Sequence, residues 1–321
     1  MLCFQAFKLY THTYTRTYAS LMLTKYIYTN FDINITKYNI DKRMATRDTF
    51  VKKDALRRIV SDIKDLRLNP LTAHGIYYEH DEVDVLKGRA LIIGPADTPY
   101  ADGFYLFKFE FPANYPHAPP MVQFCTGDGV TRFNPNLYRT GKVCLSILNT
   151  WKGEPWSGCQ TISSVLLAIC TVLNAEPLLN EPGITKAHRD FHTYNAILTY
   201  KNIEVAIFDM LARVAEPTRV AEPSVYAQKD DETTVISPPS LTKENECGCM
   251  RTNEKEFSIF GDIMREHFQL NKEKIRERVE AQAQQTQAHE APQTQAQPRE
   301  YIMNVYKMTV VTDYTKLLAK F

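Results

Sequence analysis

A helical repeat of apolar residues opens the organised part of the chain. In VKKDALRRIVSDIKDL, residues 51–66, apolar side chains recur every three or four positions, which places them on one helical face. That face is made by Val51, Ala55, Ile59, Ile63 and Leu66. The segment predicts an amphipathic helix that ends at Asn69-Pro70, because the residue before a proline disfavours helical backbone.

Four strand-like segments come after the first helix. They are joined by turns rich in Gly, Pro and Asp, and in the third segment aromatic residues alternate with Lys108 and Glu110. Strands this close in the chain usually pair with their neighbours, so the pattern predicts an antiparallel meander with one buried face. The predicted strands are residues 75–80, 85–94, 104–111 and 121–125.

Helical patterns return after the strands. TISSVLLAICTVL, residues 161–173, carries apolar residues at helical spacing, and similar patterns cover about 188–213 and 257–280. A helix, a four-stranded antiparallel meander and then further helices predict an α+β fold.

Composition narrows the classes of partner. The chain has 321 residues, 44% of them hydrophobic, and its net charge is +1, so no bulk electrostatic attraction to nucleic acid or to a membrane is expected. No apolar stretch reaches the roughly 18 residues that a membrane span needs. The seven cysteines are odd in number and scattered, which favours free thiols in a reducing compartment. We therefore expect a cytoplasmic protein, with the nucleus left open as a second location.

The N-terminal region differs in composition from the rest of the chain. Residues 1–45 are rich in Tyr and Thr and show no sustained period. They predict a disordered leader or a non-native N-terminal extension, and a start of translation at Met44 would explain the latter. An organellar transit peptide is an alternative interpretation, although such peptides carry more arginine than this segment does.

The C-terminal region divides into three parts. The polar residues 216–256, which include prolines, predict a linker, and residues 257–281 predict an amphipathic helix that packs back on the core. Residues 282–321 begin with a Gln/Ala/Pro run that has little apolar bulk, so they are expected to form a low-complexity, mostly disordered tail. Cys247 and Cys249 have no second pair of ligands nearby, and no metal site is expected.

The segment RFNPNLYRTGKVCLSIL contains the candidate reactive group. Cysteine is among the most buried residue types, and a structural role is the ordinary interpretation of Cys125 and Cys170. Cys144 differs, because Asn134-Pro135-Asn136 and Gly141 impose an irregular backbone around it. Asparagines in such a loop supply amide donors, which a developing oxyanion requires. Cys144 is therefore a candidate nucleophile.

Taken together, these motifs resemble the core of a ubiquitin-conjugating enzyme. The resemblance rests on Tyr-Pro-x-x-Pro-Pro at 115–120 and on the Pro-Asn pair followed at eight residues by Cys144. It covers about residues 48–213 and identifies 46–215 as the catalytic core. The WKGEP insertion, the NEPG at 180–183 and the long C-terminal extension are most similar to the Z-type members.

The resemblance implies a mechanism. Cys144 would accept ubiquitin or a ubiquitin-like modifier as a thioester from an activating enzyme and pass it, with a ligase, to substrate lysines. Asn136 would stabilise the oxyanion or brace the loop, and Asn134, which stands where most members have His, would fix the loop by a hydrogen bond. Glu181 is a candidate for orienting the incoming lysine, with a solvated loop carboxylate as the alternative. No cofactor is expected to bind, since ATP is used upstream by the activating enzyme.

The resemblance also implies partner surfaces. The activating enzyme would dock on the first helix, and ligases would contact two loops, one with His117 and one with Ser157 and Gly158. His117 stands where a Phe is often seen in this family, which casts doubt on binding to the common ligases. The predicted contacts for the activating enzyme are Lys52, Lys53, Arg57 and Arg58.

Two rival functions stay open. A cysteine hydrolase would also use Cys144 and would need a histidine base, for which His188 and His192 are available. A catalytically inactive ubiquitin-binding variant would share the fold, but such variants lack the acceptor cysteine.

Overall fold

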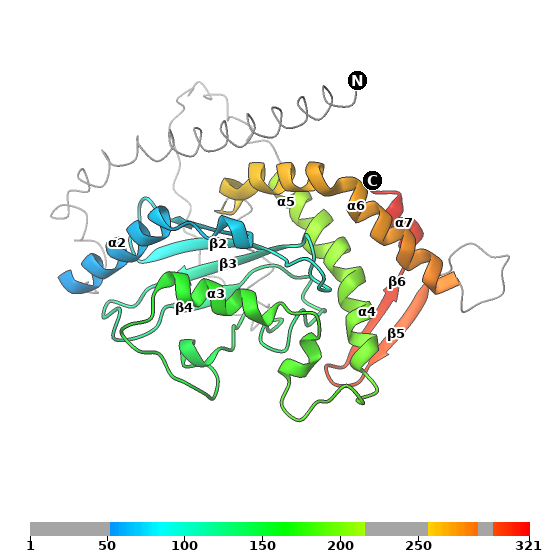
Figure 1. The fold of residues 1–321 in the computed structure, drawn as a ribbon, viewed down its shortest axis with the longest axis horizontal. Coiled ribbons are helices and arrows are strands. Elements are labelled where there is room, and N and C mark those ends of the chain that lie inside the picture. The colour runs from blue at the N-terminus through cyan, green and yellow to red at the C-terminus, as the bar shows by residue number, and fades with distance from the viewer. Residues whose placement is uncertain (1–51, 216–255, 288–297) are drawn as a thin grey trace, which may run out of the picture.

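A computed structural model describes residues 52–215, 256–287 and 298–321, which Figure 1 shows as a ribbon. The whole predicted leader (1–45) and all of the predicted linker (216–256) except Glu256 lie outside these ranges, so both expectations remain predictions.

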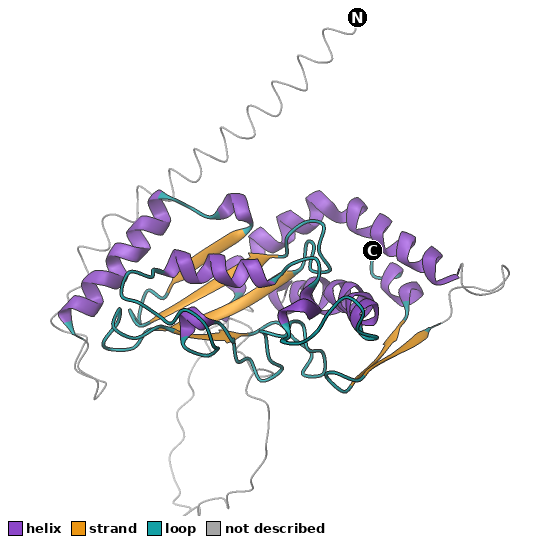
Figure 2. Cartoon of the chain, turned by 60° about the horizontal axis from the view of Figure 1, so that its bottom comes forward, coloured by secondary structure: helices purple, strands orange, loops and turns teal. Residues whose placement is uncertain are grey.

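The centre of the structure is the predicted meander. Strands β1 (Ile76–His80), β2 (Lys87–Ile93), β3 (Phe104–Glu110) and β4 (Met121–Phe124) pair antiparallel in the order β1-β2-β3-β4. Figure 2 shows these strands in orange, with helices beside them. The α+β fold predicted from the sequence is confirmed.

Helices flank the sheet where the apolar repeats predict them. α2 (Lys53–Leu68) ends at Asn69, and it contacts α3 (Ile162–Val172). Thr161 and Ser164 exchange side-chain hydrogen bonds to each other's backbone N–H, and this capping box starts α3. α4 (Phe191–Lys201) continues through a π-helical stretch, Asn202–Asp209, into α5 (Met210–Ala215).

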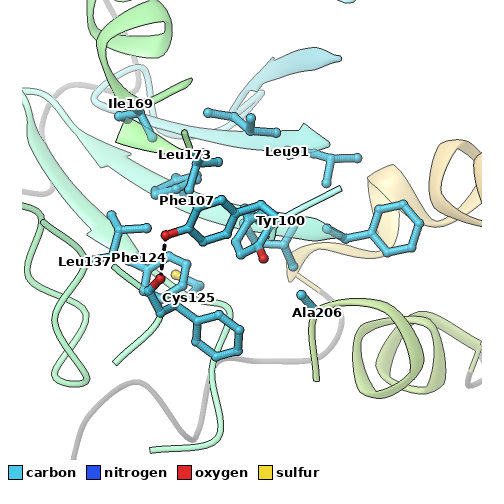
Figure 3. Close-up of a cluster of buried hydrophobic side chains, with 14 of the residues drawn as sticks. Leu91, Tyr100, Phe107, Phe124, Cys125, Leu137, Ile169, Leu173 and Ala206 are labelled. Atoms are coloured by element: carbon cyan, nitrogen blue, oxygen red, sulfur yellow. Dashed lines mark hydrogen bonds between the residues drawn. The ribbon is translucent and has the colours of Figure 1, made fainter. Parts of the chain in front are cut away.

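The core under the sheet is rich in aromatic side chains. Figure 3 shows Tyr100 among Leu91, Phe107 and Phe124 from the strands and Leu173 from the end of α3. The Tyr100 hydroxyl is buried but donates to the carbonyl of Phe133 at 2.8 Å. A buried phenol needs such a partner, so the core carries a polar link toward the Asn134 segment.

The C-terminal region is ordered over most of its length. α6 (Gly261–Gln287) is followed by a hairpin of β5 (Arg299–Met303) and β6 (Met308–Thr312) and by α7 (Tyr314–Leu318). The predicted helix at 257–281 is confirmed and runs to Gln287. The expectation of a mostly disordered tail over 282–321 is wrong for residues 282–287 and 298–321.

Alternation of buried and exposed residues explains the hairpin. Met308, Val310 and Thr312 are buried while the residues between them are exposed, the period of a strand with one covered face. Figure 1 shows β5 and β6 beside α4, and both strands contact that helix. The apolar residues of this segment are visible in the sequence, but after the low-complexity run the sequence leaves their role open.

A charged cluster holds α6 against the domain. Asp102 accepts a hydrogen bond from His267 at 3.0 Å and pairs with Arg278 at 2.9 Å. Burial opposes the ionisation of Asp102, but the two partners outweigh it and hold the pKa of the carboxyl below its usual value. A pairing of this kind fixes the position of α6 on the core.

None of the helices in the described residues combines the length and the apolar character that a bilayer crossing requires.

The packing of the tail generates the first prediction. Leu317 of α7 is fully buried, so Leu317→Ala is expected to lower the free energy of unfolding by about 2–5 kcal/mol in urea denaturation. The matched control is Ile302→Ala on the exposed face of β5, which should stay within about 0.5 kcal/mol of wild type. Equal stabilities of the two variants would mean that the tail does not pack on the domain.

Candidate active site

Two hydrogen bonds join Asn136 and Cys144. The Asn136 carbonyl accepts from the Cys144 N–H at 2.8 Å, and the Asn136 Nδ2 donates to the Cys144 carbonyl at 2.7 Å. Gly141 makes this return of the chain possible with φ +86°, and a Cβ there would lie 2.9 Å from the Phe124 carbonyl. The eight-residue spacing therefore closes a loop whose two ends are fixed to each other.

Cys144 is buried but lies outside the contiguous hydrophobic cluster. The residue is 2% exposed, and Val143 and Leu145 on either side of it are members of the core cluster while Cys144 is not. Successive side chains of extended backbone point to opposite sides, so the core anchors the segment through the neighbours of the cysteine. Thr150 closes the far side, accepting from the Leu145 N–H at 2.9 Å and donating to the Val143 carbonyl at 2.8 Å.

Asn134 is a brace and not a group that a substrate can reach. It is fully buried, and its Nδ2 donates to the Tyr100 hydroxyl at 2.8 Å and to the Val172 carbonyl at 2.7 Å. Its Oδ1 accepts from the Asn136 N–H at 2.9 Å. The predicted loop-fixing hydrogen bond is therefore present, and the assignment of Asn134 to the catalytic residues becomes a positioning role.

Glu181 lies beside this network. The neighbouring Asn180 donates to the Val172 carbonyl at 3.1 Å and lies 3.5 Å from the Asn134 Oδ1. The Glu181 carboxylate is half-buried and accepts a hydrogen bond from the Tyr306 hydroxyl at 2.7 Å. The solvated loop carboxylate considered from the sequence is thus wrong in one respect, because one oxygen of Glu181 is held by the protein.

Arg132 is a part of the site that sequence reasoning missed. Its guanidinium donates to the carbonyls of Asn134 at 2.9 Å and Pro135 at 2.6 Å, and its carbon lies 3.3 Å from the centre of the Tyr138 ring. It lies 5.2 Å from the ring centre of Tyr306 in the tail. An arginine two residues before an irregular Asn-Pro-Asn turn was a sequence signal for these contacts, whereas Tyr306, 174 residues beyond, gave none.

The predicted activating-enzyme face is only partly free. Lys52, Lys53 and Arg57 are exposed, in keeping with a docking role that remains a prediction. Arg58 instead pairs with the buried Asp62 at 2.8 Å and donates to the carbonyls of Gly158 and Gln160 at 2.7 and 2.6 Å. Arg58 therefore has an internal role, and its contact with the activating enzyme stays a prediction.

The two predicted ligase loops lie side by side. His117, Ser157 and Gly158 are exposed, and the Trp156 Nε1 donates to the Pro116 carbonyl at 2.6 Å. The structure brings these residues into one surface, and contact with a ligase stays a prediction.

The described ranges contain no cluster of metal ligands. Within 52–215, 256–287 and 298–321, no three His, Cys, Asp or Glu residues group as metal ligands. Cys247 and Cys249 lie outside those ranges.

Comparison with known proteins agrees with this geometry. The sequence model of the family described as "Ubiquitin-conjugating enzyme" matches residues 58–201. Residues 58–201 of the chain thus form a ubiquitin-conjugating enzyme domain.

The Z type is found among its relatives, as the sequence predicted. Ubiquitin-conjugating enzyme E2 Z of Homo sapiens is 46% identical over 159 residues, covering 49% of this chain and 44% of the human protein. The Danio rerio protein of that name is 44% identical over 162 residues, covering 50% and 49%. A probable ubiquitin-conjugating enzyme protein 17 of Caenorhabditis elegans is 36% identical over 179 residues, covering 51% and 24%. The match therefore spans less than half the length of each of these relatives.

The internal role of Arg58 yields a second prediction. Arg58→Ala leaves the buried Asp62 carboxylate without its cation and the two loop carbonyls without a donor. The free energy of unfolding is expected to fall by about 1.5–3 kcal/mol, measured by urea denaturation. Arg57→Ala, one position earlier and exposed, should change it by no more than about 0.5 kcal/mol. If Arg58→Ala left the free energy of unfolding unchanged, the internal role of Arg58 would be excluded.

Proposed function

We propose that this chain carries ubiquitin or a ubiquitin-like modifier as a thioester on Cys144 and transfers it to lysine side chains. The observation that carries the proposal is the pair of hydrogen bonds between Asn136 and Cys144 within a domain of the ubiquitin-conjugating enzyme family. These hydrogen bonds hold a cysteine that lies outside the contiguous hydrophobic cluster next to an amide donor. A nucleophile beside such a donor is the combination that acyl transfer requires.

Charging of Cys144 would be an exchange of one thioester for another. The Cys144 sulfur attacks the modifier's C-terminal carbonyl carbon, a new carbon–sulfur bond forms, and the bond to the activating enzyme's cysteine breaks. Cys144 gives up its thiol proton when its sulfur attacks, and the departing thiolate of the activating enzyme takes up a proton. ATP is consumed upstream by the activating enzyme, and no cofactor takes part at this site.

Transfer would convert the thioester to an amide. The acceptor nitrogen attacks the same carbonyl carbon, and the oxyanion that forms is stabilised by an amide donor. Asn136 is the candidate, either directly or through its hold on the Cys144 carbonyl. The carbon–sulfur bond then breaks, and the sulfur leaves as thiolate, which is a good leaving group.

The partners of this function would be the modifier, an activating enzyme, ligases and substrate proteins with acceptor lysines. The exposed Lys52, Lys53 and Arg57 support docking of the activating enzyme, and the surface of His117, Ser157 and Gly158 supports docking of a ligase. Cys159 and Cys170, which form no disulfide, support a cytoplasmic location, with the nucleus as a second one.

The rival functions have less support. In the described part of the chain, Cys144 has hydrogen bonds only to Asn136, whereas a hydrolase needs a histidine in contact with its nucleophile. The His188 ring instead accepts from the backbone N–H of Asp190 at 3.1 Å. An inactive ubiquitin-binding variant is favoured by no observation.

The covalent step is tested by a third prediction. With activating enzyme, ATP and ubiquitin, the wild-type chain should form an adduct that dithiothreitol removes, whereas Cys144→Ser should form an adduct that resists the thiol, since serine makes an oxygen ester. The measurement is a gel run with and without reducing agent. Cys159→Ser, which replaces an exposed thiol, should behave as wild type. Failure of the wild type to charge with any modifier tried would exclude the proposed function.

Asn136 provides a fourth prediction. Asn136→Ala should slow transfer from the charged enzyme to free lysine about 10²- to 10³-fold, the usual loss when an oxyanion donor is removed. Single-turnover discharge after quenching of the activating enzyme measures this rate. Asn271→Ala, which removes an amide that bonds to the His267 carbonyl on α6, is the control and should leave the rate unchanged. A wild-type rate in Asn136→Ala would remove this residue from the mechanism.

A further inference from the structure

The turn of the C-terminal hairpin contacts residues of the candidate active site. Tyr306 in this turn donates its hydroxyl to the Glu181 Oε2 at 2.7 Å, and its carbonyl accepts from the Arg139 guanidinium at 2.8 Å. Its ring centre lies 5.2 Å from the Arg132 guanidinium and 5.6 Å from the ring centre of Tyr194. One tail residue thus contacts four positions of the family domain.

The turn itself is held in place. The buried Asp190 carboxylate accepts from the backbone N–H groups of Asn304 at 2.9 Å and Val305 at 3.0 Å. Met303 and Met308, which face each other at the ends of the two strands, are each 1% exposed. Fixed backbone on both sides means that Tyr306 is presented to Glu181 in one orientation.

Tyr306 acts on Glu181 as a donor. Burial and the adjacent Glu181 carboxylate raise the pKa of Tyr306 above its usual value, so its hydroxyl keeps its proton. The hydrogen bond fixes the Oε2 of Glu181, while the Oε1 has no hydrogen-bond partner within the described residues. A carboxylate held at one oxygen keeps the other available for an incoming cation at little further cost in side-chain entropy.

A contiguous set of hydrogen bonds connects the loop of Glu181 to the backbone of Cys144. Asn180, next to Glu181, reaches the Asn134 Oδ1, which accepts from the Asn136 N–H, and Asn136 binds Cys144 at both backbone groups. Arg132, in contact with the Tyr306 ring, donates to the Asn134 carbonyl. The loop of Glu181 and the loop of Cys144 are therefore parts of one hydrogen-bonded unit.

We propose that Tyr306 is a positioning residue for the transfer step, holding the Glu181 carboxylate so that its free oxygen receives the ammonium group of the acceptor lysine. This inference rests on the proposed function. The ammonium must release one proton to solvent before its nitrogen attacks the thioester carbon. As the amide forms, the nitrogen loses a second proton, and the departing Cys144 thiolate takes one up.

The test compares nucleophiles on the charged full-length chain. After charging with ubiquitin and quenching of the activating enzyme, discharge is followed with free lysine and, separately, with hydroxylamine, which is uncharged at neutral pH. Tyr306→Phe keeps the ring on Arg132 and removes only the hydroxyl. We expect it to slow discharge to lysine about 10- to 100-fold, the loss of one hydrogen bond to a charged group, and to leave discharge to hydroxylamine within about twofold. The control is Tyr301→Phe on the same hairpin, which should match wild type with both nucleophiles.

A double-variant comparison tests the route of action. Glu181→Gln should also slow lysine discharge selectively, and the combination of Glu181→Gln with Tyr306→Phe should be no slower than Glu181→Gln alone, because Tyr306 acts through that carboxylate. Equal loss with lysine and hydroxylamine would assign Tyr306 a merely structural role and overturn the inference, as would unchanged or faster lysine discharge. Absence of charging in the wild type would instead count against the proposed function.

Discussion

The site depends on one buried carboxamide. Asn134 has no exposed surface, and each polar atom of its side chain has a partner, drawn from Tyr100 in the core, Val172 at the end of α3 and the backbone of Asn136. An unsatisfied amide at this depth would cost several kcal/mol, so the arrangement specifies a single geometry. Asn136 is set by Asn134, and the cysteine segment is set by Asn136.

The hydrophobic core reaches the same segment by a second route. Val143 and Leu145 pack into the cluster that Figure 3 shows in part, and Cys144 between them stays outside it. Apolar packing of Val143 and Leu145 therefore anchors the segment to the core, and hydrogen bonds from Asn136 hold its backbone in place. The low exposure of Cys144 also restricts which groups can approach the sulfur.

The C-terminal region packs on the ubiquitin-conjugating enzyme domain through specific polar contacts. The Asp102 pair with His267 and Arg278 attaches α6, and the Asp190 carboxylate attaches the hairpin turn. If the C-terminal region detached, buried groups of the domain and of the tail would become exposed or lose their hydrogen-bond partners. The domain matched at 58–201 therefore depends on the tail to cover part of its surface. In the same way, Arg58 links α2 to the loop at Gly158, which joins the two predicted partner surfaces mechanically.

The sequence by itself determined the local elements and singled out Cys144 as the candidate nucleophile. Periods of two and of three to four placed the strands, α2, α3 and α6 within a few residues, and the spacing of Asn136 and Cys144 identified the loop, because these signals are local in the chain. Only the tertiary structure decided that Arg58 faces inward, that Asn134 is sealed and that residues 298–321 fold. It alone brought Tyr306 to Glu181, since a contact across more than a hundred residues arises from how separate elements pack and leaves no periodic trace in the sequence.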